Sequence, residues 1–475
     1  MKRKLHSYLD LPPLAGVCAF EEAERIGYSV EENVRLLKRY HYALKRSFEI
    51  LLSRIPSIPI YELKMGLSYH SYLLTENISV LRKRISEMRE PPLGLDEVPD
   101  NSLEIFFDEI RNVEDPMEMF VGVYWVALPS FFSAIEKHLA ETNILVDHPT
   151  VRLLRHLKAD LLDIIPWGKA CLEKWQLHFQ NEPEFKKWQK IFLCYLTAAG
   201  DIHGKSKKPS RLPARNRSTK PFVFQKVPYR DERFPDPFNM GVSGMGFLQN
   251  KTFPPEAKNL MLLFKRIREI DVPEMMASII METPDKPWDY YREMTRQLWD
   301  EARHAMMGEV GLAHHGIDWT KACIPHIWSY ELNTLLTPLQ RHAILHSIEQ
   351  GLMAKTGKRF EWEIATASGD RLSATFHDYD WADEVLHAQT GRNWYVPNFK
   401  NNAEANEKSN EAYEMIRKSR PDYRAMGLTQ HENWWPRFYQ HACKVLGMEY
   451  DERVANYNTS EFSNGDPQDA RVDSG

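Results

Sequence analysis

Apolar residues recur at helical spacing along almost the whole chain, and stretches that alternate strictly between apolar and polar residues are short and rare. Apolar positions three or four residues apart predict amphipathic α-helices. The sequence therefore predicts an all-α protein. In the N-terminal half we expect helices at about 30–54, 60–89, 116–142, 149–179 and 184–199. In the C-terminal half we expect them at about 255–282, 286–313, 336–365, 373–391, 402–418 and 430–447.

The helical pattern is interrupted between the two halves. Residues 201–250 are rich in Pro, Lys and Arg and show no periodicity, which is typical of a linker. This segment separates a helical bundle at 1–200 from a second bundle at 251–450. The polar residues 451–475 predict a disordered tail.

The two predicted bundles share a faint internal repeat. In each, a Pro-x-x-Pro turn precedes a long helix, which begins at Tyr61 in the first and at Trp288 in the second. In this overlay Leu74 and Asn77 stand where the second helix carries Glu301 and His304. We therefore expect the N-terminal bundle to be a degenerate copy without metal ligands.

The C-terminal half contains the sequence Asp-Glu-x-x-His twice, at residues 300–304 and 383–387. Helical residues three apart lie on one face, so each copy directs a carboxylate and an imidazole to the same point. Two such helices, together with one Glu from each of two further helices, would surround a pair of metal ions. The repeated motif therefore predicts a dinuclear metal site.

Two isolated glutamates have suitable spacing to complete this site. Glu274 lies 27 residues before Glu301, and Glu349 lies 35 residues before Glu384. At about 1.5 Å per residue, such spacings allow one helix, a turn and a returning helix. Each glutamate lies in an apolar stretch, where a carboxylate needs a partner that a metal ion can supply. Glu282 is the alternative to Glu274.

The composition restricts the class of protein. A net charge of −5 argues against a dedicated nucleic-acid binder. The five cysteines show no paired spacing, which indicates free thiols in a reducing compartment. No uninterrupted apolar stretch approaches the roughly 18 residues of a membrane span, and no signal peptide is recognised. We therefore expect a cytoplasmic protein without a membrane partner.

These motifs resemble the ferritin-like di-iron carboxylate superfamily, and are most similar to its bacterial ferritin-like proteins of unassigned function. The resemblance covers about residues 255–395, including the second motif and the Gly-Arg-Asn-Trp sequence that begins at Gly391. It implies a ferritin-like four-helix bundle that binds two metal ions, usually iron. The implied ligands are Glu274, Glu301, His304, Glu349, Glu384 and His387.

The resemblance also implies how the ligands are supported. Asp383 would hold the imidazole of His304, and Asp300 that of His387, with Arg303 between the two aspartates. Glu301 or Glu349 would bridge the two ions.

One residue departs from the family pattern. His346 lies three residues before Glu349, on the same face of its helix. It is either a seventh ligand or a core histidine.

Carboxylate and imidazole ligands suit iron or manganese. We therefore expect an O₂-activating di-iron oxidoreductase, with Mn/Fe as the alternative metal pair. An oxygenase of this kind would act on a small organic metabolite and take electrons from an external donor, and a homodimer is compatible with this class.

The alternative is a non-catalytic ferritin-like metal-binding or RNA-associated protein. The basic residues between His203 and Lys220 suggest RNA. They lack interleaved aromatic residues, so we do not expect nucleic acid to bind.

Overall fold

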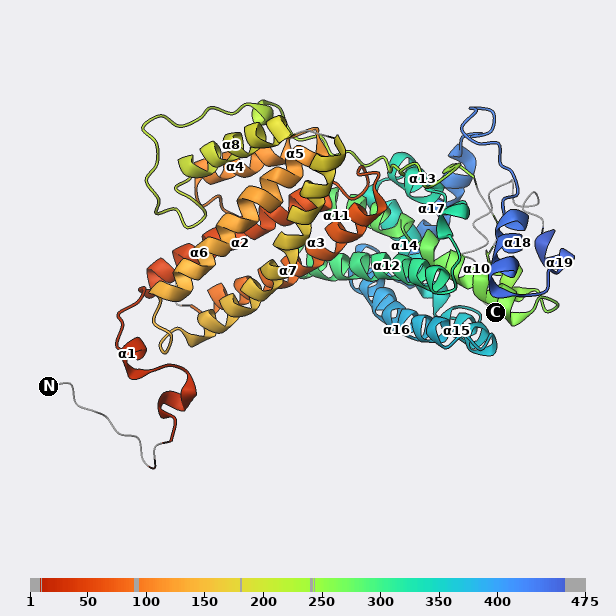
Figure 1. The fold of residues 1–475 in the computed structure, drawn as a ribbon, viewed down its shortest axis with the longest axis horizontal. Helices are drawn as coiled ribbons and strands as arrows, with labels where there is room; N and C mark the ends of the chain where they lie inside the picture. The colour runs from red at the N-terminus through yellow and green to blue at the C-terminus, as the bar shows by residue number, and fades with distance from the viewer. Residues whose placement is uncertain are drawn as a thin grey trace. The chain divides into compact units, whose positions relative to one another are not determined.

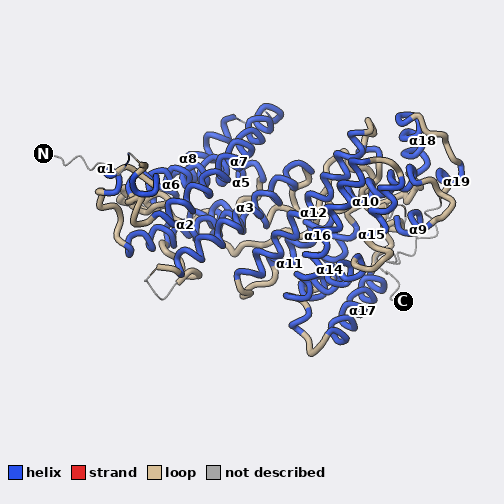
Figure 2. Tube along the Cα trace, turned by 90° about the horizontal axis from the view of Figure 1, so that it is seen from below, coloured by secondary structure: helices blue, strands red, loops and turns tan. Residues whose placement is uncertain are grey.

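The structure is a computed structural model that describes residue 9 and residues 11–88, 94–179, 182–239, 242 and 244–457. Helices joined by loops account for these residues, and no strand occurs among them (Figure 2). The prediction of an all-α protein is confirmed.

The chain forms two compact units. Unit 1 contains residues 1–50 and 73–223, and unit 2 contains residues 51–72 and 224–475. Helix α3 (Tyr61–Ser86) therefore contributes its first part to unit 2 and the rest to unit 1. This division differs from the expected boundaries, because the segment 201–250 is shared between the units and residues 51–72 belong with the C-terminal half.

Unit 1 is built from helices (Figure 1), and many of their apolar side chains are buried. One stretch, Pro116–Glu141, is long and apolar enough to cross a membrane by length and composition, and 72% of its most apolar window is buried within the structure. That stretch comprises α5 (Pro116–Phe120), a π-helix η3 (Val121–Ala127) and α6 (Leu128–Glu141). The other helices here are α1 (Phe20–Ala23), α2 (Val30–Leu52), α4 (Asn101–Arg111), α7 (His148–Phe179) and α8 (Glu182–Ala198).

The basic segment that follows α8 lies against acidic side chains of unit 1. Arg215 contacts Asp108 at 2.5 Å and Glu104 at 3.3 Å. Lys208 contacts Asp100 at 2.9 Å. Lys205 and Arg217 are paired in the same way with Glu32 and Glu118. Ion pairs within the protein thus neutralise much of the charge that suggested RNA.

Unit 2 contains four helical segments that pack side by side. The first is α10 (Pro255–Arg268) followed by α11 (Asp271–Met281), and the second is α12 (Trp288–His314). The third is α14 (Pro338–Leu352) followed by α15 (Lys358–Ala367), and the fourth is α16 (Arg371–Trp394). Helix α12 packs against α10, α11 and α16, while α14 packs against α11 and α16 (Figure 1). The remaining helices are α9 (Gly244–Gln249), α13 (Ile327–Leu335), α17 (Asn402–Ser419), α18 (Trp435–Leu446) and α19 (Glu452–Ala455).

The first and third segments are each broken where a single long helix was expected. Between α10 and α11 the break falls at Glu269 and Ile270. Pro273 explains it, because a proline has no N–H and its ring clashes with the carbonyl four residues earlier, which is that of Glu269. Between α14 and α15 the chain turns at residues 353–357. A Cβ on Gly357 would lie 2.2 Å from the carbonyl oxygen of Leu352, so only glycine fits there.

The expected tail also contains a short helix. Residues 452–455 form α19, in which Val454 and Ala455 are buried. Residues 458–475 lie outside the described residues.

Candidate metal centre

Four buried side chains from three helices converge at one point in unit 2. Glu301 comes from α12, Glu349 from α14, and Glu384 and His387 from α16. Each places one ligand atom within 4.8 Å of the others. The His387 Nδ1 lies 3.2 Å from a Glu301 oxygen and 3.3 Å from a Glu384 oxygen. We call these four residues group A.

A second set of side chains adjoins group A and shares Glu384 with it. Group B consists of Glu269, His304, Asp380 and Glu384, again with ligand atoms within 4.8 Å of one another. The His304 Nδ1 lies 3.3 Å from Asp380 and 3.5 Å from Glu269. Glu384 is thus the carboxylate common to both groups. Glu301 also lies between the two imidazoles, at 3.2 Å from His387 and 3.6 Å from His304.

Each aspartate that precedes a motif glutamate contacts the imidazole of the other motif, as the resemblance implies. His304 Nε2 lies 3.2 Å from Asp383, and His387 Nε2 lies 3.5 Å from Asp300. Arg303 joins both aspartates, at 2.8 Å from Asp383. These contacts fix each Nδ1 toward the carboxylates and so orient both imidazoles as ligands.

Two cations that the sequence analysis did not identify are buried in group B. The Lys358 Nζ, at the start of α15, lies 2.8 Å from Asp380, 2.8 Å from Glu384 and 3.6 Å from Glu269. The Arg266 guanidinium lies 2.5 Å from Asp380 and 2.8 Å from Glu269. Both side chains are about 1% exposed.

The carboxylates determine the charge of the basic groups. Burial opposes protonation, but Asp380 and its neighbours raise the pKa of His304 well above the usual range, and Glu384 does the same for His387. Burial and Arg266 oppose the charge on Lys358, yet Asp380, Glu269 and Glu384 raise its pKa well above normal. Surroundings that favour these positive charges also favour a metal cation.

The acidic groups respond in opposite directions. Burial raises the pKa of Glu349 well above its usual value, and the carboxylates of Glu384 and Glu301 raise it further. Burial also opposes ionisation of Glu384, but Lys358 lowers its pKa well below normal. The difference arises because Glu384 contacts the Lys358 ammonium, whereas Glu349 has a neutral donor, Gln297, at 2.9 Å and lies next to the Glu384 carboxylate.

Several ligand atoms lack a hydrogen-bond partner in the described part of the chain. In group A they are one oxygen each of Glu349 and Glu384, and the Nδ1 of His387. In group B they are one oxygen of Glu269 and the Nδ1 of His304. Burying polar atoms without partners is costly, and a coordinated metal ion would satisfy them. The donor set fits iron or manganese.

The structure corrects the position of Glu274. This carboxylate lies in a separate buried cluster, 2.7 Å from Lys64 and 2.8 Å from Ser329, and also pairs with Arg230. The break caused by Pro273 changes the register of the helix, so Glu269 rather than Glu274 faces His304. Glu282, the alternative, pairs with Lys226 at 3.1 Å and with Arg341.

His346 does not join either group. Its ring packs at 5.0 Å from that of Tyr395 and lies against Gly391, where a Cβ would be 2.4 Å from the His346 Nδ1. Burial lowers its pKa to about 4. His346 is therefore a neutral core histidine in this structure.

Spacing in the sequence could have identified two of the missed residues. Glu269 lies 32 residues before Glu301, whereas Glu274 lies 27 residues before it. The spacing of 32 is nearer to the 35 residues that separate Glu349 from Glu384. Asp380 lies four residues before Glu384 and so shares its helix face. No comparable signal marks Lys358, because its position depends on the turn at Gly357.

A small cavity adjoins group A. Its volume is about 60 Å³, and Glu301, Glu349 and Glu384 are among the residues that line it. Glu269, Asp271 and Ser329 also line it, and the remaining lining residues are apolar, among them Met275, Leu345, Ile348, Leu352 and Trp328 of α13.

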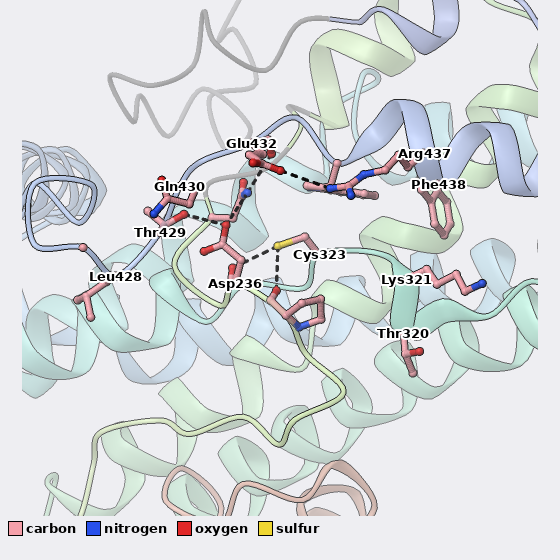
Figure 3. A pocket seen from close by; sticks show the side chains of 14 residues that line it. Asp236, Thr320, Lys321, Cys323, Leu428, Thr429, Gln430, Glu432, Arg437 and Phe438 are labelled. Atoms are coloured by element: carbon pink, nitrogen blue, oxygen red, sulfur yellow. Dashed lines mark hydrogen bonds and ion pairs between the residues drawn. The ribbon is translucent and has the colours of Figure 1, made fainter.

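A larger cavity, of about 740 Å³, is lined by none of the candidate ligands (Figure 3). Its one thiol, Cys323, points toward the backbone carbonyls of Asp236 and Pro235, at 3.2 and 3.3 Å (Figure 3). Burial and the nearby Asp236 raise the pKa of Cys323 to about 12. The thiol is thus protonated at neutral pH and a poor nucleophile.

Comparison with protein-family models, curated proteins and solved structures finds no match to this chain. The interpretation of the site therefore rests on its geometry and on the sequence motifs.

Proposed function

We propose that unit 2 is a ferritin-like four-helix bundle that holds a redox-active metal ion, iron or manganese, and uses it for O₂-dependent oxidation of a small organic substrate. The observation that carries this proposal is group A, in which three carboxylates and one imidazole converge with buried, unpartnered ligand atoms. A ferritin-like arrangement is supported by the order of the ligands, since α12 and α16 each supply a Glu-x-x-His pair and α14 supplies a lone Glu.

The metal ion would supply electrons to O₂, and the chain's own residues would prepare the site. Asp300 would hold the Nε2–H of His387, so that Nδ1 faces the metal position. Gln297 would orient Glu349 by its hydrogen bond to one oxygen, leaving the other oxygen toward group A. The apolar side chains that line the small cavity would limit the access of bulk water to the reacting atoms.

The proposal is tested by anaerobic loading of the full-length protein with Fe(II), metal analysis, and mixing with O₂ while absorbance is recorded. We expect bound iron and a change in the visible spectrum on mixing. Glu301→Ala and His387→Ala should each abolish iron retention, because each removes a group A ligand. Retention of iron by Glu301→Ala at the wild-type level would contradict this ligand set.

The alternative function is a non-catalytic metal-binding protein. The small cavity keeps it in consideration, because 60 Å³ accommodates O₂ but not an organic metabolite without movement of the lining. Iron that is retained but does not react with O₂ would favour this alternative over the oxidoreductase.

A further inference from the structure

We propose that the Lys358 ammonium takes the place of the second metal ion, so that the chain binds one metal ion at group A and holds an internal cation at group B. The inference rests on the proposed function, since it requires a metal ion at group A. The chain would then bind one metal ion, whereas the sequence motifs predict two.

The position of the ammonium carries the argument. Lys358 Nζ contacts both oxygens of Asp380, at 2.8 and 3.0 Å, and one oxygen of Glu384 at 2.8 Å. It lies 3.6 Å from Glu269. These are three of the four residues of group B. A metal ion bound there would need the same oxygens, and a divalent cation at that distance would repel the ammonium.

The charged side chains around the two groups also favour a metal ion at group A over group B. In group B, Asp380 and Glu269 are already paired with Arg266, at 2.5 and 2.8 Å, in addition to Lys358. In group A, neither Glu301 nor Glu349 forms an ion pair with a lysine or arginine anywhere in the described chain. Group B is therefore neutralised by fixed cations, while group A retains carboxylates that need one.

Glu384 links the two positions. One of its oxygens accepts from Lys358, and the other lies 3.3 Å from His387 Nδ1 without a hydrogen-bond partner in the described residues. In a two-metal site this carboxylate would bridge two ions. Here its geometry fits a bridge between one metal ion and the ammonium.

The fold holds the lysine in place. Lys358 is the first residue of α15, directly after Gly357, whose backbone lies too close to the Leu352 carbonyl for any side chain. Its side chain is fully buried and ends among carboxylates. Movement out of group B would remove the cation that contacts both oxygens of Asp380 and would leave these buried carboxylates with one positive charge fewer.

The test counts metal ions, using Mn(II) as the probe. The full-length protein is loaded anaerobically with excess Mn(II), desalted, and examined by metal analysis and electron paramagnetic resonance. We expect one Mn per wild-type chain with the spectrum of an isolated ion. Lys358→Met removes the charge at similar length, and we expect two Mn per chain with a spin-coupled spectrum.

Two further variants serve as controls. Lys265→Met removes a lysine that pairs with Glu361 but touches neither group, and should keep one Mn. Lys358→Arg retains the positive charge and should also keep one. Two Mn per wild-type chain, or one Mn in a folded Lys358→Met, would overturn the inference. No Mn in the wild type would instead reject the proposed metal site.

A second pair of variants decides the question if Lys358→Met does not fold. Glu269→Gln alters only group B and should retain one Mn per chain, whereas Glu349→Gln alters only group A and should retain none. Loss of Mn in Glu269→Gln with retention in Glu349→Gln would place the ion at group B and overturn the inference.

Discussion

The two isolated glutamates closest to the site have different partners, and this difference determines what each contributes. Glu274 is fully buried among Lys64, Arg230 and Ser329, which together satisfy both of its oxygens. Glu349 is equally buried but has one oxygen without a partner in the described structure. The first carboxylate therefore stabilises the fold, and the second is available to a ligand.

Glu274→Ala should retain metal and destabilise the protein. Removing one partner of a buried ion pair leaves Lys64 and Arg230 uncompensated, which costs about 3–5 kcal/mol. The free energy of unfolding of the metal-free protein, measured with urea, should fall by about that amount. Loss of metal without loss of stability would contradict the structural role.

Glu349→Ala should have the opposite effect. It removes a carboxylate whose burial raises its pKa and which has no cation partner, so the metal-free protein should lose less stability than with Glu274→Ala. Metal retention should be abolished. Urea unfolding and metal analysis of both variants give the comparison directly.

At the scale of single residues, the sequence predicted where the side chains of the repeated motif lie, but not where the isolated residues of the site lie. The spacing inside a helix is fixed, so Glu301, His304, Glu384 and His387 meet as expected, together with their supporting aspartates. A lone glutamate can be placed only if the helix is continuous. Pro273 breaks that continuity and moves the ligand position from Glu274 to Glu269.

Among the elements, α10 and α12 approach each other closely at Gly308. A Cβ on Gly308 would lie 2.4 Å from the backbone nitrogen of Ile267 and 2.7 Å from the backbone oxygen of Leu263. Because backbone atoms cannot move aside as a side chain does, the two helices depend on glycine at this position. Their approach brings Glu269, at the end of α10, to the His304 side chain of α12.

Gly308→Ala should force α10 away from α12. We expect a loss of about 1–3 kcal/mol or more in the free energy of unfolding, as for other overpacked sites. Gly311→Ala is the matched control, since its Cβ would meet only the side chain of Leu263, which can rotate. Thermal unfolding of the two variants should differ clearly. Equal melting temperatures would show that the backbone contact is not limiting.

The sequence pattern identified most long helices but merged those that break. Helical periodicity continues through residues 353–357 and through Glu269, so α14 with α15, and α10 with α11, were each expected as one helix. The proline and glycine that cause the breaks were visible in the sequence. Periodicity shows which face of a helix is apolar but not where the chain turns. The effect of these two residues on the site could therefore not be derived from it.

Across the whole molecule, buried neutral histidines make stability depend on pH. Burial lowers the pKa of His138 to about 4 and that of His41 to about 3, and both rings are nearly inaccessible. The unfolded pKa is about 6.5. Below that pH the unfolded chain binds protons that the folded chain does not, so the folded state loses stability as the pH falls.

The melting temperature should therefore decrease as the pH is lowered from 6.5 toward 4. His138 alone accounts for up to about 3 kcal/mol over this range, from the difference between its two pKa values. Neither ring nitrogen of His138 has a hydrogen-bond partner among the described residues. His138→Phe should thus be tolerated at pH 7.5 and should reduce the slope, whereas an unchanged slope would contradict the buried neutral form.

The charge distribution of unit 1 leads to another prediction. Lys205, Lys208, Arg215 and Arg217 are engaged with acidic side chains, so few of these charges remain for phosphates. Filter binding of tRNA at low salt should show no retention. Retention that disappears as salt increases would revive the RNA-associated alternative.

The narrow cavity beside group A has a consequence for the exchange of metal. A space of about 60 Å³ has room for a few water molecules but not for a larger solute. A chelator such as EDTA is far larger and could reach a bound ion only when the surrounding helices open. Release of metal should then proceed at the rate of that opening, and raising the chelator concentration beyond saturation should not make it faster.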